Sequence, residues 1–215
     1  MTTFTANPEK DNFFLFPNPF VWWTKLDCHE EIKEKYIPLI NKDIDINQKY
    51  YNQKNDWNCK ITTSFFNEDK FLLHIFDEEF LNKVIWNSVD KMLAELTHKI
   101  YLPVPDSSII NHVWYNKYDD LNWQEIHNHE NIGSPNQFSG IYLLSLEEQY
   151  TTCFVYQQHL KCYTSETLYT LNTSHLDEGH VIIFPCELMH YVNPSITKNR
   201  LTVSFNIDCN YNGTK

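Results

Sequence analysis

The chain has 215 residues, of which 42% are hydrophobic and 15% aromatic, so it carries enough apolar surface for a globular fold, and disorder is not the expected state. Its formal charge of −11 at pH 7 argues against nucleic acid as a general partner, because phosphate backbones are bound through clustered Lys and Arg side chains.

The N-terminal residues indicate neither export nor membrane insertion. A signal peptide needs a basic start, an apolar run and a small-residue cleavage site, and no such stretch is present. The apolar stretch Asn12–Trp23 contains Pro17 and Pro19, and it is shorter than the roughly 20 residues that cross a bilayer. We therefore expect a cytoplasmic protein with no membrane partner.

The six cysteines are scattered without a Cys-x-x-Cys pair, so the sequence signals neither a thiolate zinc site nor a redox motif. In a cytoplasmic chain of this size we expect them to be reduced and buried. Disulfides are the alternative for a secreted protein.

Two helices are predicted in the N-terminal half, among short strands. The first follows Asp27, with Glu30 and Glu31 in its first turn and a polar loop, Tyr50–Cys59, after it. The second begins after Asp77, an N-cap residue. Each helix has an apolar stripe at helical spacing that predicts packing on a sheet: Ile32, Tyr36, Ile37 and Ile40 in the first, and Phe80, Leu81, Val84, Ile85, Val89, Met92, Leu93 and Leu96 in the second.

The C-terminal half is almost wholly strand-like. Runs rich in β-branched and aromatic residues recur at strand length, separated by clusters of turn-forming residues. They are Ile109–Tyr118, Trp123–His129, Phe138–Leu146, Thr152–Gln157, Thr167–Asn172, His180–Phe184 and Leu201–Ile207. Around eight strands in about a hundred residues are typical of a jelly roll, whose two sheets form a mouth able to hold a ligand. We expect a mainly β fold with flanking α-helices.

A pair of histidines, His127 and His129, is the first candidate site. Side chains at i and i+2 of a strand project to one face, so both imidazoles can bind one metal ion. Taken alone, the pair is equally compatible with solvent-facing or hydrogen-bonded histidines of an edge strand. A third histidine, His190, follows the apolar strand that Gly179 opens and Pro185 ends. Two ligands close in sequence and a distant third are typical of a facial metal site.

These blocks resemble the phage and bacterial branch of the iron(II)- and 2-oxoglutarate-dependent oxygenases, which is similar to the prolyl hydroxylases. The resemblance covers Asn111–Ile207 closely and the N-terminal half loosely, where Leu15-Phe16-Pro17 matches the usual opening. The segments that carry it are His127-Asn128-His129, Phe138–Tyr142, Glu178–Pro185, His190 and Arg200–Asn206.

The resemblance implies a double-stranded β-helix of the jelly-roll, cupin-like kind. It also implies Fe(II), 2-oxoglutarate and O2 as cofactor and cosubstrates, and hydroxylation of a peptidyl (prolyl in the family) or small-molecule C–H bond with release of succinate and CO2. We expect a single domain, 1–215, in which 1–108 supply strands and supporting helices and 109–208 form the core with the metal site. For a phage protein, the cytoplasm would be that of the infected host cell.

By position, the resemblance assigns the metal to His127, His129 and His190, with no catalytic residue beyond these ligands. It assigns Arg200 to the far carboxylate of 2-oxoglutarate. Thr202, two residues along the same strand, can add a hydroxyl to that carboxylate. Tyr142 and Asn116 are weaker candidates for the cosubstrate pocket, since packing in the core or in a strand ladder explains them as well. For Arg200 the alternative is an ordinary surface arginine.

His129 is the chief departure, because most of the wider superfamily has Asp or Glu there. The nearby carboxylates Glu125 and Glu130 are alternative ligands, Glu125 the better placed of the two. Two other functions stay open: a three-histidine, cupin-like dioxygenase that needs no 2-oxoglutarate, and a β-sandwich binding module without catalysis. Arg200 argues against the first and the three histidines against the second. The sequence names neither the primary substrate nor the oligomeric state.

Overall fold

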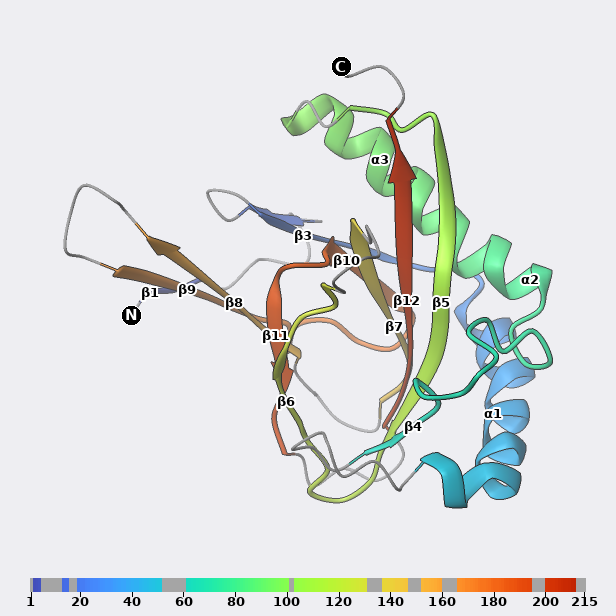
Figure 1. The fold of residues 1–215 in the computed structure, drawn as a ribbon. Helices are drawn as coiled ribbons and strands as arrows, with labels where there is room; N and C mark the ends of the chain where they lie inside the picture. The colour runs from blue at the N-terminus through green and yellow to red at the C-terminus, as the bar shows by residue number, and fades with distance from the viewer. Residues whose placement is uncertain are drawn as a thin grey trace.

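The computed structural model describes residues 2–4, 13–15, 19–51, 61–100, 103–130, 137–146, 152–159, 166–194 and 200–211. Two β-sheets face each other, and helices cover the outer face of the larger one (Figure 1). This is the double-stranded β-helix with flanking helices that the sequence predicts.

Helical segments from the N-terminal half form the outer layer. They are α1 (His29–Tyr51), α2 (Glu78–Phe80), a π-helical turn (Leu81–Trp86) and its continuation α3 (Asn87–Ile100). The predicted N-cap is confirmed, because the Asp77 side chain accepts a hydrogen bond from the Phe80 N–H. The predicted first helix is longer than its apolar stripe suggested and runs to Tyr51, and the remainder of the predicted loop Tyr50–Cys59 lies outside the described residues.

The seven-stranded sheet has the order β2-β3-β10-β7-β12-β5-β4. Its strands are β2 (Phe13–Leu15), β3 (Phe20–Lys25), β4 (Thr62–Thr63), β5 (Ser107–Tyr118), β7 (Phe138–Ser145), β10 (His180–Pro185) and β12 (Arg200–Asn210). The N-terminal part thus contributes strands to the large sheet, with β3 paired to β10 and β4 paired to β5.

The five-stranded sheet has the order β1-β9-β8-β11-β6. Its strands are β1 (Thr2–Phe4), β6 (Gln124–His127), β8 (Thr152–His159), β9 (Glu166–Asn172) and β11 (Met189–Val192). Two details differ from the sequence prediction. The strand predicted to run to His129 ends at His127, and the segment with His190 forms a separate short strand, β11, which pairs with β6 and β8.

Apolar residues fill two layers. One cluster, which includes Tyr36, Phe80 and Tyr142, lies between the helices and the large sheet. A second, which includes Ile141, Phe154 and Phe184, lies between the two sheets. Neighbouring residues of one strand, such as Ile141 and Tyr142, therefore face different layers, as strand geometry requires.

Gly179, in the turn before β10, has a φ of +88°, a conformation that L side chains rarely adopt. A β-carbon there would also lie 2.9 Å from Cγ of His29. The turn therefore needs glycine, as the sequence suggested. No helix in the described part of the chain is long and apolar enough to span a membrane.

Candidate metal centre and cosubstrate slot

Three histidines from two neighbouring strands come together at the mouth between the sheets. His127 ends β6 and lies opposite His190 of β11 in the strand register. His129 lies two residues beyond β6, where its backbone N–H donates to the carbonyl of Cys186. One ring nitrogen of each histidine lies within 4.8 Å of the other two. The structure therefore brings together the three residues that the sequence proposes as metal ligands.

Hydrogen bonds fix which nitrogen each ring presents. Nδ1 of His127 lies 2.7 Å from the Glu125 carbonyl oxygen, and Nδ1 of His190 lies 3.1 Å from that of Leu188. Nδ1 of His129 lies 3.1 Å from Oδ1 of Asn206. Oxygen acceptors require Nδ1 to carry the proton, which leaves Nε2 of each ring as the lone-pair atom. Such anchoring of the distal nitrogen is typical of histidine metal ligands.

The three rings are neutral at physiological pH. Burial lowers the pKa of His129 to about 3, assisted by the neighbouring His127 and opposed by the hydrogen bond to Asn206. Burial is also the largest cause that lowers the pKa of His127, and it holds that of His190 well below its usual value. Since a metal binds only deprotonated imidazole, these rings fit a divalent cation.

The alternative carboxylate ligands do not join this group. Among the described residues, the one cluster of three or more His, Cys, Asp or Glu side chains with metal-ligand spacing is His127, His129 and His190. Glu125 contributes its backbone carbonyl to His127, and Glu130 is exposed. The donor set is therefore three neutral imidazoles, which suits iron and also zinc, copper and nickel.

A narrow slot adjoins the histidines on the side of β12. It is lined by Trp114, Asn116, Tyr118, Gln124, His127, His129, Ile141, Thr152, His190, Val192, Arg200, Thr202 and Ser204. Arg200, the one arginine of the sequence, is 1% exposed and is therefore not a surface residue. Its guanidinium lies 4.7 Å from the centre of the Tyr118 ring, and its Nη2 donates to Oγ1 of Thr152 at 3.3 Å.

Tyr142 lies elsewhere. Its side chain is buried on the helix side of β7, and its hydroxyl is 2.7 Å from Nδ1 of His29, so it does not line the slot. Ile141, the preceding residue, faces the slot instead, because adjacent residues of a strand face opposite ways. Asn116 does line the slot, where its side-chain amide donates to the Ser204 hydroxyl at 3.2 Å. The assignment of Tyr142 to the cosubstrate pocket is therefore wrong.

Sequence reasoning missed several slot residues. Gln124 connects the two halves of the site: its Oε1 accepts from the Tyr118 hydroxyl at 2.8 Å, and its amide nitrogen lies 3.2 Å from Nε2 of His127. Trp114, a buried residue of β5, lies with its ring centre 5.3 Å from that of His129. The sequence held one signal for Gln124, because this residue lies near the start of the predicted strand that carries His127.

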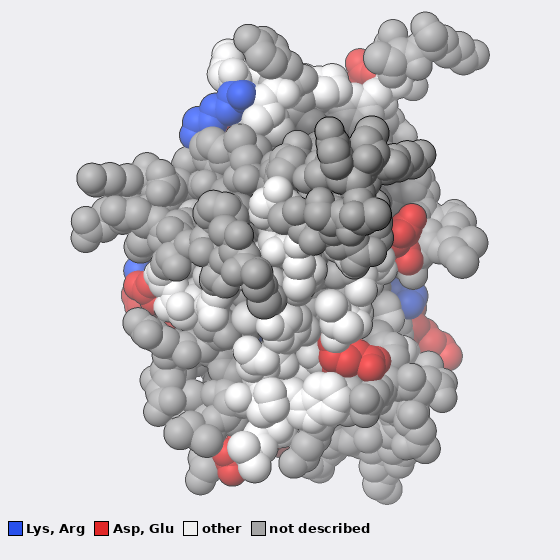
Figure 2. Space-filling model, turned by 90° about the vertical axis from the view of Figure 1, so that its left-hand side faces the viewer, with Lys and Arg blue, Asp and Glu red and all other residues white. Residues whose placement is uncertain are grey.

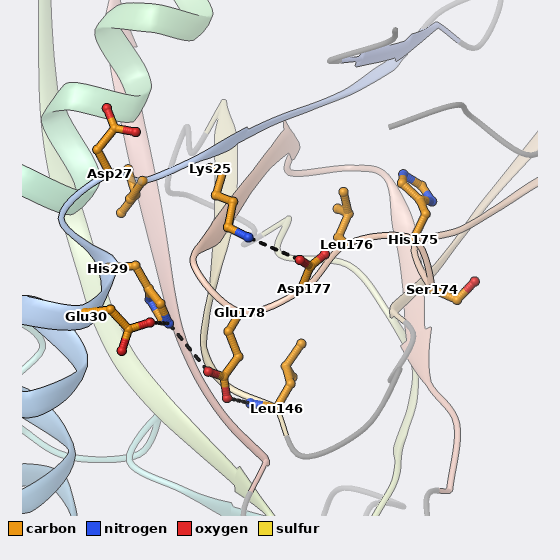
Figure 3. A pocket seen from close by; sticks show the side chains of 11 residues that line it. Lys25, Asp27, His29, Glu30, Leu146, Ser174, His175, Leu176, Asp177 and Glu178 are labelled. Atoms are coloured by element: carbon orange, nitrogen blue, oxygen red, sulfur yellow. Dashed lines mark hydrogen bonds and ion pairs between the residues drawn. The ribbon is translucent and has the colours of Figure 1, made fainter. Parts of the chain in front are cut away.

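A larger open cavity of about 750 Å³ lies away from the metal centre, near the start of α1 (Figure 3). There His29 contacts Tyr142 through Nδ1, and its Nε2 lies 3.6 Å from a carboxylate oxygen of Glu178. Glu178 in turn accepts from Lys33 and from the backbone N–H of Leu146. These contacts tie α1 to the turn before β10, which gives the side chains a structural role.

The molecular face in Figure 2 carries separate acidic and basic side chains. On this face the described Lys and Arg residues form no continuous patch. The separation of these side chains agrees with the acidic net charge of the chain.

Comparison with known proteins supports the same class. Residues 112–206, which include the three histidines, Arg200 and Thr202, match the family described as "Putative 2OG-Fe(II) oxygenase". A search of curated proteins finds no match. In fold, the chain is similar to a prolyl-4-hydroxylase from Pseudomonas putida, at 9% sequence identity and a TM-score of 0.51 over 89% of this chain and 92% of that chain.

Two further solved structures are similar. A 2OG-Fe(II) oxygenase family oxidoreductase from Burkholderia pseudomallei has 13% identity and a TM-score of 0.51, with 90% of this chain and 86% of that chain covered. AviO1 from Streptomyces viridochromogenes Tue57 has 8% identity and a TM-score of 0.54, with 91% of each chain covered. At such low identity these likenesses show the fold alone. A phage origin stays a prediction.

The two facing sheets define a double-stranded β-helix, the fold that the chain shares with these solved structures. Residues 112–206 match the 2OG-Fe(II) oxygenase family, which confirms the resemblance inferred from the sequence.

Proposed function

We propose that the chain hydroxylates a C–H bond of a peptidyl or small-molecule substrate, with Fe(II) held by His127, His129 and His190. One atom of O2 enters the substrate as a hydroxyl group and the other enters succinate, as 2-oxoglutarate loses its first carboxylate as CO2. The observation that carries the proposal is the convergence of three imidazoles, each with Nδ1 bonded to an oxygen, beside a slot that ends at a buried arginine.

The chain's own groups have separate tasks. The three Nε2 atoms hold the metal, which supplies the one-electron chemistry that O2 activation needs. Arg200 binds the far carboxylate of 2-oxoglutarate, because its planar fork of N–H donors matches two carboxylate oxygens. Thr202 lines the same slot and can donate its hydroxyl to that carboxylate. Phe154 and Phe184, whose rings lie 5.7 Å and 4.9 Å from the His190 ring, exclude water from the inner side.

The slot is too narrow for 2-oxoglutarate as it stands, with a volume of about 10 Å³. Entry of the cosubstrate therefore requires side chains to move. Gln124 lines the slot, and its amide nitrogen lies 3.2 Å from Nε2 of His127, the atom that would hold the metal. We propose that Gln124 leaves His127 when the metal and 2-oxoglutarate bind.

The three-histidine donor set also favours a second function, a dioxygenase that oxidises its substrate without 2-oxoglutarate. One experiment separates the two. The protein is loaded anaerobically with Fe(II), its iron content is measured, and succinate is quantified after addition of O2 and 2-oxoglutarate. We expect one iron per chain and succinate formation that requires 2-oxoglutarate. The exposed His98→Ala variant is the matched control. Iron binding without any succinate would favour the second function, and no iron binding would favour a binding module.

A further inference from the structure

A second cavity opens on the other side of the metal centre. It has a volume of about 260 Å³ and is lined by Phe65, Trp114, Gln124, Glu125, His127, Asn128, His129 and Asn206. Four of these residues, Trp114, Gln124, His127 and His129, also line the cosubstrate slot. The candidate metal centre therefore lies between the slot and this cavity, which we call the front cavity. A group placed in it would be next to the reacting centre.

Aromatic rings form one wall of the front cavity. The rings of Phe65 and Trp114 meet edge to face with their centres 5.1 Å apart, and the Trp114 ring adjoins His129. His112 packs behind both, with its ring centre 4.8 Å from each. A wall supported from behind in this way presents a fixed apolar surface. Such a surface favours C–H-rich groups and cations over anions, because ring faces carry partial negative charge.

The remaining residues that the structure describes in the lining are polar and include no Lys or Arg to pair with an anion. Asn128, Asn206 and Gln124 supply amides, and Glu125 is the one ionised side chain among the described lining residues. Lys70 lies over the Phe65 ring at 5.7 Å from its centre but does not line the cavity. The chain's single arginine belongs to the cosubstrate slot. A negatively charged group in the front cavity would meet a carboxylate and ring faces, and both repel it.

We infer that the front cavity selects the group to be oxidised as one apolar-bodied side chain, neutral or cationic and never anionic, with Phe65 and Trp114 as the residues that determine this specificity. The inference rests on the proposed function and names its substrate class. The volume is suited to a single side chain with its flanking amide groups, so a residue-sized probe can test it.

The probes are acetyl-X-N-methylamides in which X is proline, lysine or glutamate. Mn(II) replaces Fe(II), and 2-oxoglutarate is present without O2, so no turnover is needed. Paramagnetic broadening of the probe's side-chain proton signals by bound Mn(II) reports both binding and closeness to the metal. We expect broadening of the proline and lysine probes. The glutamate probe should bind at least tenfold more weakly than either.

Phe65 is half-buried, so Phe65→Ala should leave the fold intact where a change at the buried Trp114 would endanger it. We expect this variant to bind the proline and lysine probes about fivefold more weakly, because one aromatic contact is lost. Phe71→Ala, a phenylalanine that is 38% exposed and outside the cavity, is the matched control and should change nothing.

The outcomes separate this inference from the proposed function. If Mn(II) broadens 2-oxoglutarate signals but no probe, or the glutamate probe as strongly as the others, the front-cavity assignment is wrong and the proposed function stands. Equal probe binding by Phe65→Ala and Phe71→Ala would also overturn it. If Mn(II) does not bind to the three histidines at all, the proposed function fails first.

Discussion

The three histidines at the mouth and His29, the first residue of α1, differ in which ring nitrogen carries the proton. At the mouth, Nδ1 of His127, His129 and His190 contacts oxygen and Nε2 carries the lone pair. Beneath α1, the arrangement of His29 is reversed. The Nε2 atom of His29 faces the Glu178 carboxylate at 3.6 Å, which favours a proton on Nε2. Nδ1 then accepts from the Tyr142 hydroxyl, whose pKa is raised by burial.

The difference distinguishes a structural polar cluster from a ligand-binding one. At the start of α1 the polar side chains pair with groups of the protein, Tyr142 with His29 and Lys33 with Glu178, and these contacts stabilise the packing of helix on sheet. At the mouth one ring nitrogen of each histidine converges on the same point, an arrangement that a bound cation stabilises. Substitutions beneath α1 should therefore lower stability, and substitutions at the mouth should lower ligand affinity. Each prediction below tests that division.

The largest effect is expected for a metal ligand. His190→Ala removes one of three nitrogens and should weaken Fe(II) or Mn(II) binding by more than about 100-fold, since changes to residues behind the ligands alone cost about 10–100-fold. The circular dichroism spectrum should be unchanged. Metal titration under anaerobic conditions measures the affinity, with His98→Ala as control. A His190→Ala protein that binds metal like its parent would show that this histidine is structural, as His29 is.

The next effect concerns the cosubstrate. Arg200→Ala should weaken 2-oxoglutarate binding by about 2–5 kcal/mol, because a buried carboxylate loses a charge-assisted pair. Thr202→Val should lose one neutral hydrogen bond, worth about 1 kcal/mol. Calorimetry on the Mn(II)-loaded protein measures both. Arg200→Lys keeps the charge without the planar fork and should lie between the two. Unchanged affinity in Arg200→Ala would argue for the function that needs no 2-oxoglutarate.

A smaller effect, on stability and not on ligand affinity, is expected at Tyr142. Tyr142→Phe leaves the buried Nδ1 of His29 without its donor and should lower the free energy of unfolding by about 1–3 kcal/mol. Metal and 2-oxoglutarate affinity should not change, since the side chain lies on the helix side of β7. Urea unfolding and cosubstrate calorimetry on the same preparation test both statements. Loss of 2-oxoglutarate binding with unchanged stability would restore Tyr142 to the slot.

The error at Tyr142 shows what the sequence could not decide. Every residue of β7 from Phe138 to Leu144 is buried, because helices cover one face of the large sheet and the small sheet covers the other. A strand that is apolar on both faces gives no alternation from which to choose the inner side. Because adjacent residues face opposite ways, assigning the wrong alternate residues to the inner face places Tyr142 in the slot instead of Ile141.

The histidines were easier to find because their chemistry is local. His127 and His129 are two residues apart, and turn-forming residues mark both ends of the strand-like segments near them. The groups around Arg200 were not predictable, since Thr152 and Tyr118 reach it only after β5, β8 and β12 are placed in two different sheets. Such long-range contacts depend on pairing order, which residue patterns do not contain.

The smallest predicted effect has the opposite sign and tests the boundary between the two kinds of cluster. The amide nitrogen of Gln124 lies at hydrogen-bond distance, 3.2 Å, from Nε2 of the candidate ligand His127. Metal binding must break this contact, which is worth about 0.5–1.5 kcal/mol. Gln124→Leu should therefore tighten Mn(II) binding up to about tenfold in the absence of 2-oxoglutarate.

The same change deprives the Tyr118 hydroxyl of its acceptor and should cost about 1 kcal/mol of stability, so affinity is measured well below the unfolding temperature. Gln157→Leu, on the exposed side of β8, is the matched control. Weaker metal binding in Gln124→Leu alone would mean that the glutamine supports His127 as a ligand, and that the mouth, like the cluster beneath α1, is held in place by its own hydrogen bonds.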